Sequence, residues 1–302
     1  MSTTGGSGTP AAPVAPVERQ VGPISRTDIV KFAGAGGDFN PIHHDEEFAK
    51  RAGFPSVFAM GMFTAGLLGD FVETWLGIER IRGLSVRFVA PTWPNDVLTF
   101  GAGRPSVTDG RMAATLRVTA GDDARLSGEV VIADDESSDT TSPETPPELR
   151  SLLERLDDTV TLPIERGKVM EFARAIKSDN ALHFDPAVAR DAGFADVVAP
   201  LTFSAAVALY NGGDAADVPK QLDLDLPRMV HGEQRWTFHR PAVAGDTLIG
   251  SRRATAAWRK PTKSGGVMTF VCVTTDYKDE AGQPVLRDEM VMIERPPQPT
   301  KR

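Results

Sequence analysis

Two stretches of the chain carry side chains that can move protons, and they share a pattern. Residues 37–45 read GDFNPIHHD, and residues 177–185 read KSDNALHFD. Both end in Asn-x-x-His-x-Asp, but only the first has an acid, Asp38, five residues before its histidine, His43. A histidine titrates near neutral pH, so beside a carboxyl group it is suited to general acid–base catalysis. We predict that Asp38 and His43 form a catalytic pair.

The second stretch lacks part of this pattern. When the two are aligned on their histidines, Ser178 stands in place of Asp38 and Ala181 in place of Pro41. Without the proline, the second loop need not keep the shape of the first. A slip of one residue would bring Asp179 to the acid position, and this alternative stays open. We interpret the second stretch as a relic that keeps a histidine but has no chemistry.

Asn40 and Pro41 are predicted to shape the first loop. Proline fixes φ, and asparagine tolerates unusual backbone angles and makes local hydrogen bonds. Together they can turn the side chains of Asp38 and His43 to the same side. The adjacent run of His43, His44, Asp45 and two glutamates suggests a metal site. Capping of the following helix by Asp45 explains it better, so we expect no metal.

The two stretches belong to a longer internal repeat. Residues 31–54 match residues 171–194 at an offset of 140, and residues 88–98 match residues 238–248 at an offset of 150. An insertion of ten residues in the second copy explains the change of offset. Matching in register over this length indicates tandem homologous domains.

The domain boundaries follow from composition. Residues 1–17 carry no charge and are rich in Gly, Ser, Thr and Pro, so they are predicted to be a flexible tail. We place the first domain at 18–133 and the second at 158–296. Residues 134–157 between them are predicted to be an exposed acidic linker rich in Pro, Ser and Thr.

Each copy shows the same order of elements. A helix, at about 26–35 and again at 166–177, leads into the motif loop, and a short helix capped by Asp45 or Asp185 follows. An apolar helix comes next, at 61–76 and 201–211, and must be buried because it is apolar almost all round. Four or five strand-like runs then complete each copy. The pattern predicts an α+β fold in which each unit wraps an antiparallel sheet around a buried helix.

Composition excludes several classes of protein. The 41 acidic and 33 basic residues give a net charge of −8, which argues against a nucleic-acid-binding protein. Cys272 is the single cysteine, so no intrachain disulfide and no multi-cysteine zinc site can form. We expect no membrane insertion, because no apolar run approaches the roughly 20 residues that span a bilayer. With no export signal, we expect a cytoplasmic protein.

One local stretch departs from the acidic balance. Residues 251–263 contain no acid and five basic side chains, namely Arg252, Arg253, Arg259, Lys260 and Lys263. Arg252, Arg253, Arg259 and Lys260 are candidates for contacts with a phosphate or an acidic carrier protein. The alternative, a basic hairpin that only faces solvent, stays open.

The motif also carries a resemblance to a known family. The run from Phe32 through Gly-Asp38-Phe-Asn40-Pro41-Ile-His43, with Met60-Gly61-Met62 further on, resembles the signature of MaoC-like (R)-specific hydratases and dehydratases. The second half, with His183-Phe-Asp185 and Phe238-His-Arg-Pro, resembles the non-catalytic subunit of actinobacterial (3R)-hydroxyacyl-ACP dehydratases. The first half resembles the catalytic subunit of the same enzyme. The resemblance implies a fusion of two subunits in a double hot-dog fold.

The resemblance also implies roles for residues. Asp38 and His43 would catalyse, and the backbone amide of Gly61 would bind the thioester oxygen at the start of a buried helix. The second domain would be non-catalytic and would hold the acyl chain. No cofactor is implied. The implied partners are an acyl-ACP or acyl-CoA substrate and the acyl carrier protein, and a homodimer stays open.

The implied activity is a (3R)-3-hydroxyacyl-ACP dehydratase of type II fatty-acid elongation, which also hydrates trans-2-enoyl thioesters in reverse. One alternative is an (R)-specific enoyl-CoA hydratase of fatty-acid degradation or polyester metabolism. Another, of a different class, is a non-catalytic module that binds acyl thioesters. A thioesterase is a weaker alternative, because the Gly-Asp-x-Asn-Pro-x-His pattern is typical of hydratases.

Overall fold

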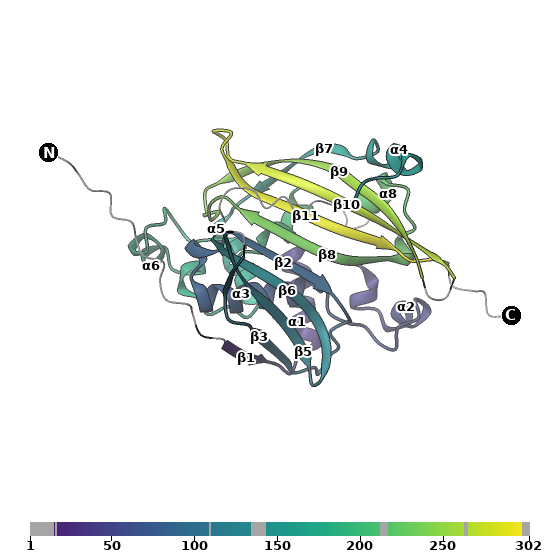
Figure 1. The fold of residues 1–302 in the computed structure, drawn as a ribbon. Coiled ribbons are helices and arrows are strands. Elements are labelled where there is room, and N and C mark those ends of the chain that lie inside the picture. The colour runs from purple at the N-terminus through teal and green to yellow at the C-terminus, as the bar shows by residue number, and fades with distance from the viewer. Residues whose placement is uncertain are drawn as a thin grey trace.

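The described part of the chain forms one antiparallel sheet with helices packed against it. The computed structural model describes residue 15 and residues 17–108, 110–133, 143–211, 217–262 and 265–297. Within these ranges the sheet has 11 strands (Figure 1). The predicted flexible tail falls almost entirely outside the described residues, as do residues 134–142 of the predicted linker.

The first half follows the predicted order of elements. Its helices are α1 (Arg26–Gly36), η1 (Pro41–His43), α2 (Glu46–Arg51), α3 (Gly61–Leu76) and η2 (Ile78–Arg80). Its strands are β1 (Val17–Val21), β2 (Gly83–Phe88), β3 (Leu98–Ala102), β4 (Ser106–Thr108), β5 (Arg111–Ala120) and β6 (Asp123–Ala133). Asp45 caps α2 as predicted, because its carboxylate accepts a hydrogen bond from the N–H of Phe48.

The second half repeats the plan with shorter helices. Its helices are η3 (Pro147–Leu149), α4 (Arg150–Leu153), α5 (Arg166–Ala175), η4 (Ala181–His183), α6 (Pro186–Asp191), η5 (Phe203–Ala206), α7 (Val207–Tyr210), α8 (Asp217–Gln221) and η6 (Leu226–Arg228). Its strands are β7 (Asp157–Pro163), β8 (Met229–Phe238), β9 (Thr247–Pro261), β10 (Val267–Lys278) and β11 (Pro284–Glu294).

The order of the strands reveals a two-fold relation between the halves. Across the described sheet the order is β1-β3-β5-β6-β2-β8-β11-β10-β9-β7, which runs through the first copy and then back through the second. The halves join where β2 pairs with β8, and the register there sets Ser85 opposite Arg235. These two residues correspond at the offset of 150, so the pseudo-two-fold axis passes between them. The internal repeat predicted from the sequence is therefore also a repeat of structure.

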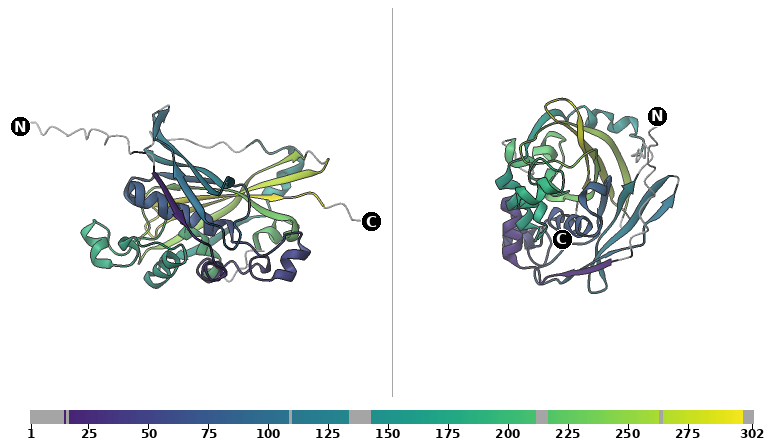
Figure 2. Two further views of the ribbon diagram at one scale, coloured as in Figure 1. Left: turned by 90° about the horizontal axis from the view of Figure 1, so that it is seen from below. Right: turned by 90° about the vertical axis from the view of Figure 1, so that its left-hand side faces the viewer.

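The helix α3 is the centre of the first half. Of its 16 residues, 12 are buried, and the curved sheet lies around it (Figure 2). Phe63, Leu67 and Leu68 are fully buried in the main hydrophobic core, which also includes residues of the second half. The prediction of a buried apolar helix at 61–76 is correct.

The corresponding prediction for the second half is wrong. Instead of one helix over 201–211, the chain forms the 3-10 turn η5 and the single helical turn α7. The physical reason is the presence of α3, which already occupies the space between the halves. The side chains of Leu201 and Thr202 lie against Gly66 and Gly69 of α3.

The helices α1 and α5 lie side by side and strengthen the junction. The rings of Phe32 and Phe172, which correspond in the repeat, meet edge to face with centroids 5.5 Å apart. Lys177 reaches across to Asp28, with Nζ 2.6 Å from Oδ1. The two halves are thus joined by a shared sheet, an aromatic contact and an ion pair.

The second part of the predicted linker is not simply exposed. Residues 147–153 form η3 and α4, and α4 packs against β9. Leu149 and Leu156 are buried in a small core with residues of β9 and β10. Their apolar side chains explain this, because burying them removes hydrocarbon surface from water.

Candidate active site

A short loop between α1 and α2 holds the predicted pair. The helix α1 ends at Gly36 and is capped by Gly37, whose φ of 76° suits glycine and turns the chain out of the helix. The carboxylate of Asp38 accepts the N–H of Asn40 at 3.1 Å, and the side-chain oxygen of Asn40 accepts the N–H of Ile42 at 3.2 Å. Pro41 then begins η1, which ends at His43. Local hydrogen bonds thus place Asp38 and His43 on the same loop.

The imidazole of His43 is oriented by a backbone carbonyl. Its Nδ1 lies 2.8 Å from the carbonyl oxygen of Phe58, which can only accept, so Nδ1 carries a proton. In the neutral ring, Nε2 is then unprotonated, and it faces Asp38 with 3.6 Å between Nε2 and Oδ2. That separation is too long for a direct hydrogen bond. The basic Nε2 atom of His43 and the carboxyl group of Asp38 therefore both face the space between them.

Burial keeps His43 neutral near pH 7. The residue is 8% exposed. Desolvation lowers the pKa of His43 below its usual value of 6.5, and the charge of Asp38 and the Phe58 carbonyl only partly oppose this. Aromatic rings surround the site, since Phe58 packs edge-on against His43 and also contacts Phe54 and Trp93.

Gly61 begins α3, three residues after Phe58. The residue before it, Met60, has no side chain that caps the helix, so the first N–H groups of α3 have no capping acceptor of that kind. A Cβ atom at Gly61 would lie 2.9 Å from the ring of Phe88. Only glycine fits there without moving the ring. The segment from Phe58 to Gly61 thus joins the histidine to an anion-attracting helix end.

The second half contributes to the wall of this site. The ring of His231, on β8, lies 4.6 Å from the ring of Phe88, centroid to centroid. Its Nε2 is 2.9 Å from the side-chain oxygen of Gln234. Burial lowers the pKa of His231 to about 4, so it is neutral at pH 7. His231 corresponds to Ile81 in the first copy, and no sequence motif marked it.

The second loop keeps the geometry of the first. The hydroxyl of Ser178 accepts the N–H of Asn180 at 3.2 Å, as Asp38 does for Asn40. His183 ends η4, and its Nδ1 lies 2.7 Å from the carbonyl oxygen of Val198. Without the proline the second loop was free to differ from the first, but it keeps the same shape. The Asn hydrogen bonds and the 3-10 turn hold the shape without it.

The alternative slip of one residue is also wrong. Ser178 occupies the place of Asp38, and Asp179 is exposed to solvent. Lys177 stands where the first copy has Gly37, and it adopts a left-handed φ of 57° despite its side chain. The backbone of the second loop thus has the same conformation, although Ser178 replaces the acid.

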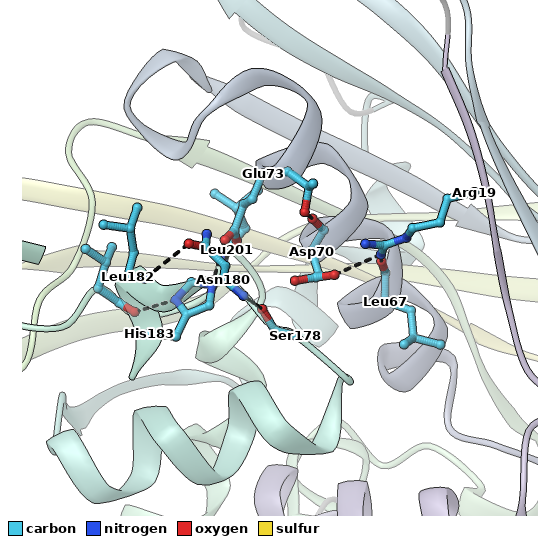
Figure 3. Close-up of polar contacts among 11 residues, drawn as sticks. Arg19, Leu67, Asp70, Glu73, Ser178, Asn180, Leu182, His183 and Leu201 are labelled. Atoms are coloured by element: carbon cyan, nitrogen blue, oxygen red, sulfur yellow. Dashed lines mark hydrogen bonds and ion pairs between the residues drawn. The ribbon is translucent and has the colours of Figure 1, made fainter. Parts of the chain in front are cut away.

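The second copy contains an acid that the sequence motif did not reveal. Glu73, near the end of α3, points at His183, with 2.9 Å between Oε2 and Nε2 and neither side chain exposed (Figure 3). Its other oxygen, Oε1, accepts the N–H of Leu201 at 2.8 Å. Desolvation alone would lower the pKa of His183, but the carboxylate of Glu73 outweighs it and raises that pKa above 6.5. Both ring nitrogens face acceptors, and this environment favours the imidazolium form of His183.

One signal in the sequence points toward Glu73. It and Asp70 are acids within an otherwise apolar helix, and buried acids require partners. Asp70 finds one in Arg19, with Nη2 2.8 Å from Oδ2. The partner of Glu73 is 110 residues away in sequence, so only the tertiary structure identifies it.

The four basic candidates on β9 divide into two pairs. Arg252 makes a two-pronged contact with Asp158 at 2.8 and 2.6 Å, and Arg253 lies 2.9 Å from Asp276. These two guanidinium groups are engaged within the fold. Arg259 and Lys260 are exposed, with Lys260 above the ring of Phe270 at 5.2 Å. For the exposed Arg259 and Lys260, contact with a carrier protein or a phosphate stays a prediction.

The described residues contain no cluster of three or more His, Cys, Asp or Glu side chains arranged to hold a metal ion. Across the same ranges, no helix is long and apolar enough to cross a bilayer.

Comparison with known sequences links both halves to dehydratases. Residues 9–124 match the MaoC-like domain, and residues 154–288 match the dehydratase domain region described as FAS1-like. A UPF0336 protein of Saccharopolyspora erythraea is 35% identical over 137 residues, which cover 45% of this chain and 84% of that protein.

Comparison with solved structures extends over nearly the whole chain. A MaoC domain protein dehydratase from Chloroflexus aurantiacus aligns with a TM-score of 0.62 and 13% identity, covering 95% of each chain. A Mycobacterium tuberculosis protein described as a double hot-dog fold aligns with a TM-score of 0.60 and 14% identity, covering 94% of this chain and 97% of that one. At this identity the likeness concerns the fold, and the predicted double hot-dog arrangement is confirmed.

Proposed function

This chain belongs to the family of the UPF0336 proteins and joins a MaoC-like domain to a FAS1-like dehydratase region, and from that premise we propose that it is a (3R)-3-hydroxyacyl thioester dehydratase. The observation that carries the proposal is the pair of Asp38 and His43. One neutral ring nitrogen and one carboxyl group face each other across 3.6 Å. Hydratase or dehydratase chemistry of this general kind agrees with the matched family, and the resemblance predicted from the motif is confirmed.

In the proposed reaction, His43 and Asp38 each transfer one proton. In dehydration, Nε2 of His43 takes the proton from C2, and the electron pair of that C–H bond forms the C2=C3 double bond. The C3–O bond breaks, and the hydroxyl leaves as water with a proton from Asp38. Hydration is the reverse, with Asp38 accepting a proton from the attacking water. The orientation of the ring by Phe58 supports the role of base for Nε2.

Gly61 is proposed to stabilise the charge that develops on the thioester oxygen. Its N–H belongs to the first turn of α3, where no carbonyl of the helix can accept it. The positive end of the helix dipole adds to the attraction. The close contact with Phe88 explains why a larger residue would displace this N–H.

The second half is proposed to be non-catalytic and to bind the acyl chain. Ser178 gives it no acid at the working position, and His183 is paired with Glu73. A small, mostly apolar cavity is lined by Leu162, Phe203 and Phe238 of this half together with Ile78 and Ile81 of the first half. We propose acyl carrier protein as the carrier, with the exposed side chains of Arg259 and Lys260 as contacts, and type II fatty-acid elongation in the cytoplasm as the setting.

An assay with purified protein tests the reaction. We expect loss of the conjugated enoyl absorbance when trans-2-enoyl-CoA substrates of several chain lengths are added, without release of free thiol. Thiol release would favour a thioesterase. No change with enoyl-CoA or enoyl-ACP of any length would favour a non-catalytic binding module. The ratio of kcat/KM for ACP and CoA substrates decides between elongation and the alternative of an enoyl-CoA hydratase.

The pH dependence of dehydration has a predicted sign. His43 must be neutral to take the C2 proton, and its pKa lies below 6.5. Asp38 must carry the proton that it donates, so acidification from pH 8 to 6.5 should cause no loss of kcat/KM, and we expect a fall with decreasing pH only below the pKa of His43. A rate that already declines between pH 8 and 7 on acidification would contradict this assignment of the base.

A further inference from the structure

The second copy shows how this type of site holds a carboxylate. The two oxygens of Glu73 are divided between the ring of His183, at 2.9 Å, and the backbone N–H of Leu201, at 2.8 Å. The histidine and Glu73 are both completely buried. The ring of His183 and the backbone N–H of Leu201 thus bind one carboxylate, which belongs to a side chain of the same protein.

The carboxylate of Glu73 reaches these two groups because α3 packs closely against the second copy. Gly66, Gly69 and Glu73 lie on one side of the helix, at spacings of three and four residues. A Cβ atom at Gly66 would lie 2.5 Å from Ile176, and one at Gly69 would lie 3.4 Å from Thr202. The glycines therefore allow α3 close enough for the carboxylate to reach Leu201.

Both groups that contact the carboxylate of Glu73 have counterparts in the first copy. At the offset of 140, His183 corresponds to His43 and Leu201 corresponds to Gly61. The two histidines are held alike, by backbone carbonyls at 2.8 and 2.7 Å. At the same offset from Glu73 the sequence has Gly213, which carries no carboxylate and lies outside the described residues.

We propose that the first copy binds free carboxylic acids in the same way, with one carboxylate oxygen toward Nε2 of His43 and the other on the N–H of Gly61. The ligands are short 2-enoic and 3-hydroxy acids, the free-acid forms of the proposed thioesters. The choice of acid rests on the proposed function, whereas the binding mode rests on the second copy. The acids would compete with the thioester, because both use the same N–H.

Binding should take up a proton. In the second copy a carboxylate at this place raises the pKa of its histidine above 6.5, whereas burial lowers the pKa of His43 below 6.5. Among the described residues, the titratable side chains that act on His43 are Asp38, at 3.6 Å from Nε2, and exposed His44. An anion beside Asp38 requires that the ring between them become positive.

Calorimetric titration with crotonate, a 2-enoic acid of four carbons, tests the inference on the intact protein. We expect the dissociation constant to rise by up to tenfold per pH unit between pH 6.5 and 7.5, with a binding heat that depends on the ionisation enthalpy of the buffer. Crotonamide has the same shape without the charge, and we expect it to bind at least tenfold more weakly at pH 6.5.

Two variants locate the site. His43→Gln should lose at least tenfold in crotonate affinity and all proton uptake, whereas His44→Gln, at the exposed neighbour, should bind as the wild type does. Equal binding of crotonate and crotonamide, binding unaffected by His43→Gln, or no binding at all would each overturn the inference. The outcome is independent of turnover. Crotonate binding without enoyl-CoA hydration would leave the inference standing and refute the proposed function, and hydration without crotonate binding would do the reverse.

Discussion

Replacing His43 by alanine is expected to lower kcat for hydration of trans-2-enoyl thioesters by a factor of about 10² to 10⁴, the usual contribution of a general acid or base. Asp38→Asn, which keeps the size of the side chain, should have an effect of similar size. Each change removes one of the two groups proposed to transfer protons. Both lie on a loop in which the side chains of Asp38 and Asn40 accept the N–H groups of Asn40 and Ile42. Steady-state kinetics with purified variants measures the loss.

The second copy supplies the matched control. Ser178→Ala alters the position that corresponds to Asp38, where the hydroxyl only accepts the N–H of Asn180. We expect its kcat to equal that of the wild type. A large loss in Ser178→Ala, or full activity in His43→Ala, would refute the assignment of chemistry to the first copy alone. Circular dichroism of each variant establishes that the fold is retained.

Replacing Glu73 by alanine should destabilise the protein by about 3–5 kcal/mol, the usual cost of removing one partner of a buried ion pair. The imidazolium of His183 would be left buried with no counter-ion, and the N–H of Leu201 would lose its acceptor. Urea denaturation at pH 6 measures the change in the free energy of unfolding. A change below about 1 kcal/mol, the range of exposed pairs, would contradict the buried pair seen here.

Controls separate the charge from the packing. Glu73→Leu combined with His183→Leu replaces both partners with apolar side chains, so it should cost much less than Glu73→Ala alone. Acetate in the buffer should restore part of the stability of Glu73→Ala, because it can occupy the place of the lost carboxylate. The same acetate should have no such effect when His183 is also replaced by leucine.

The pair also makes stability depend on pH. The pKa of His183 is raised above 6.5 in the folded protein, so its protonation stabilises the fold fully below pH 6.5. That stabilisation is lost as pH rises through the folded pKa of His183. For this reason His183→Ala is a poor test of catalysis unless rates are expressed per folded molecule. His183→Ala should unfold more easily while its folded fraction keeps wild-type kcat.

Local patterns in the sequence determined most of the elements and one site. The capping acid Asp45, the apolar run at 61–76 and the alternating strand runs act over a few residues, so they predict helices and strands without knowledge of the rest. The repeat at offsets of 140 and 150 predicted two copies, and the strand order bears this out. The proximity of Asp38 and His43 was also predictable, because they stand five positions apart on one loop.

The local structure of the second copy and the partner of its histidine could be determined only from the tertiary structure. Its sequence alone suggested a helix at 201–211 and a loosened loop, but α3 of the first half fills the space and Asn180 holds the loop. Glu73 meets His183 across 110 residues, and His231 meets Phe88 across 143. Contacts at such separations depend on how two halves pack, and no local pattern of residues encodes them. The sequence by itself therefore determined that Asp38 and His43 lie together on one loop, whereas the packing of the two halves determined that the second histidine contacts a carboxylate of its own chain.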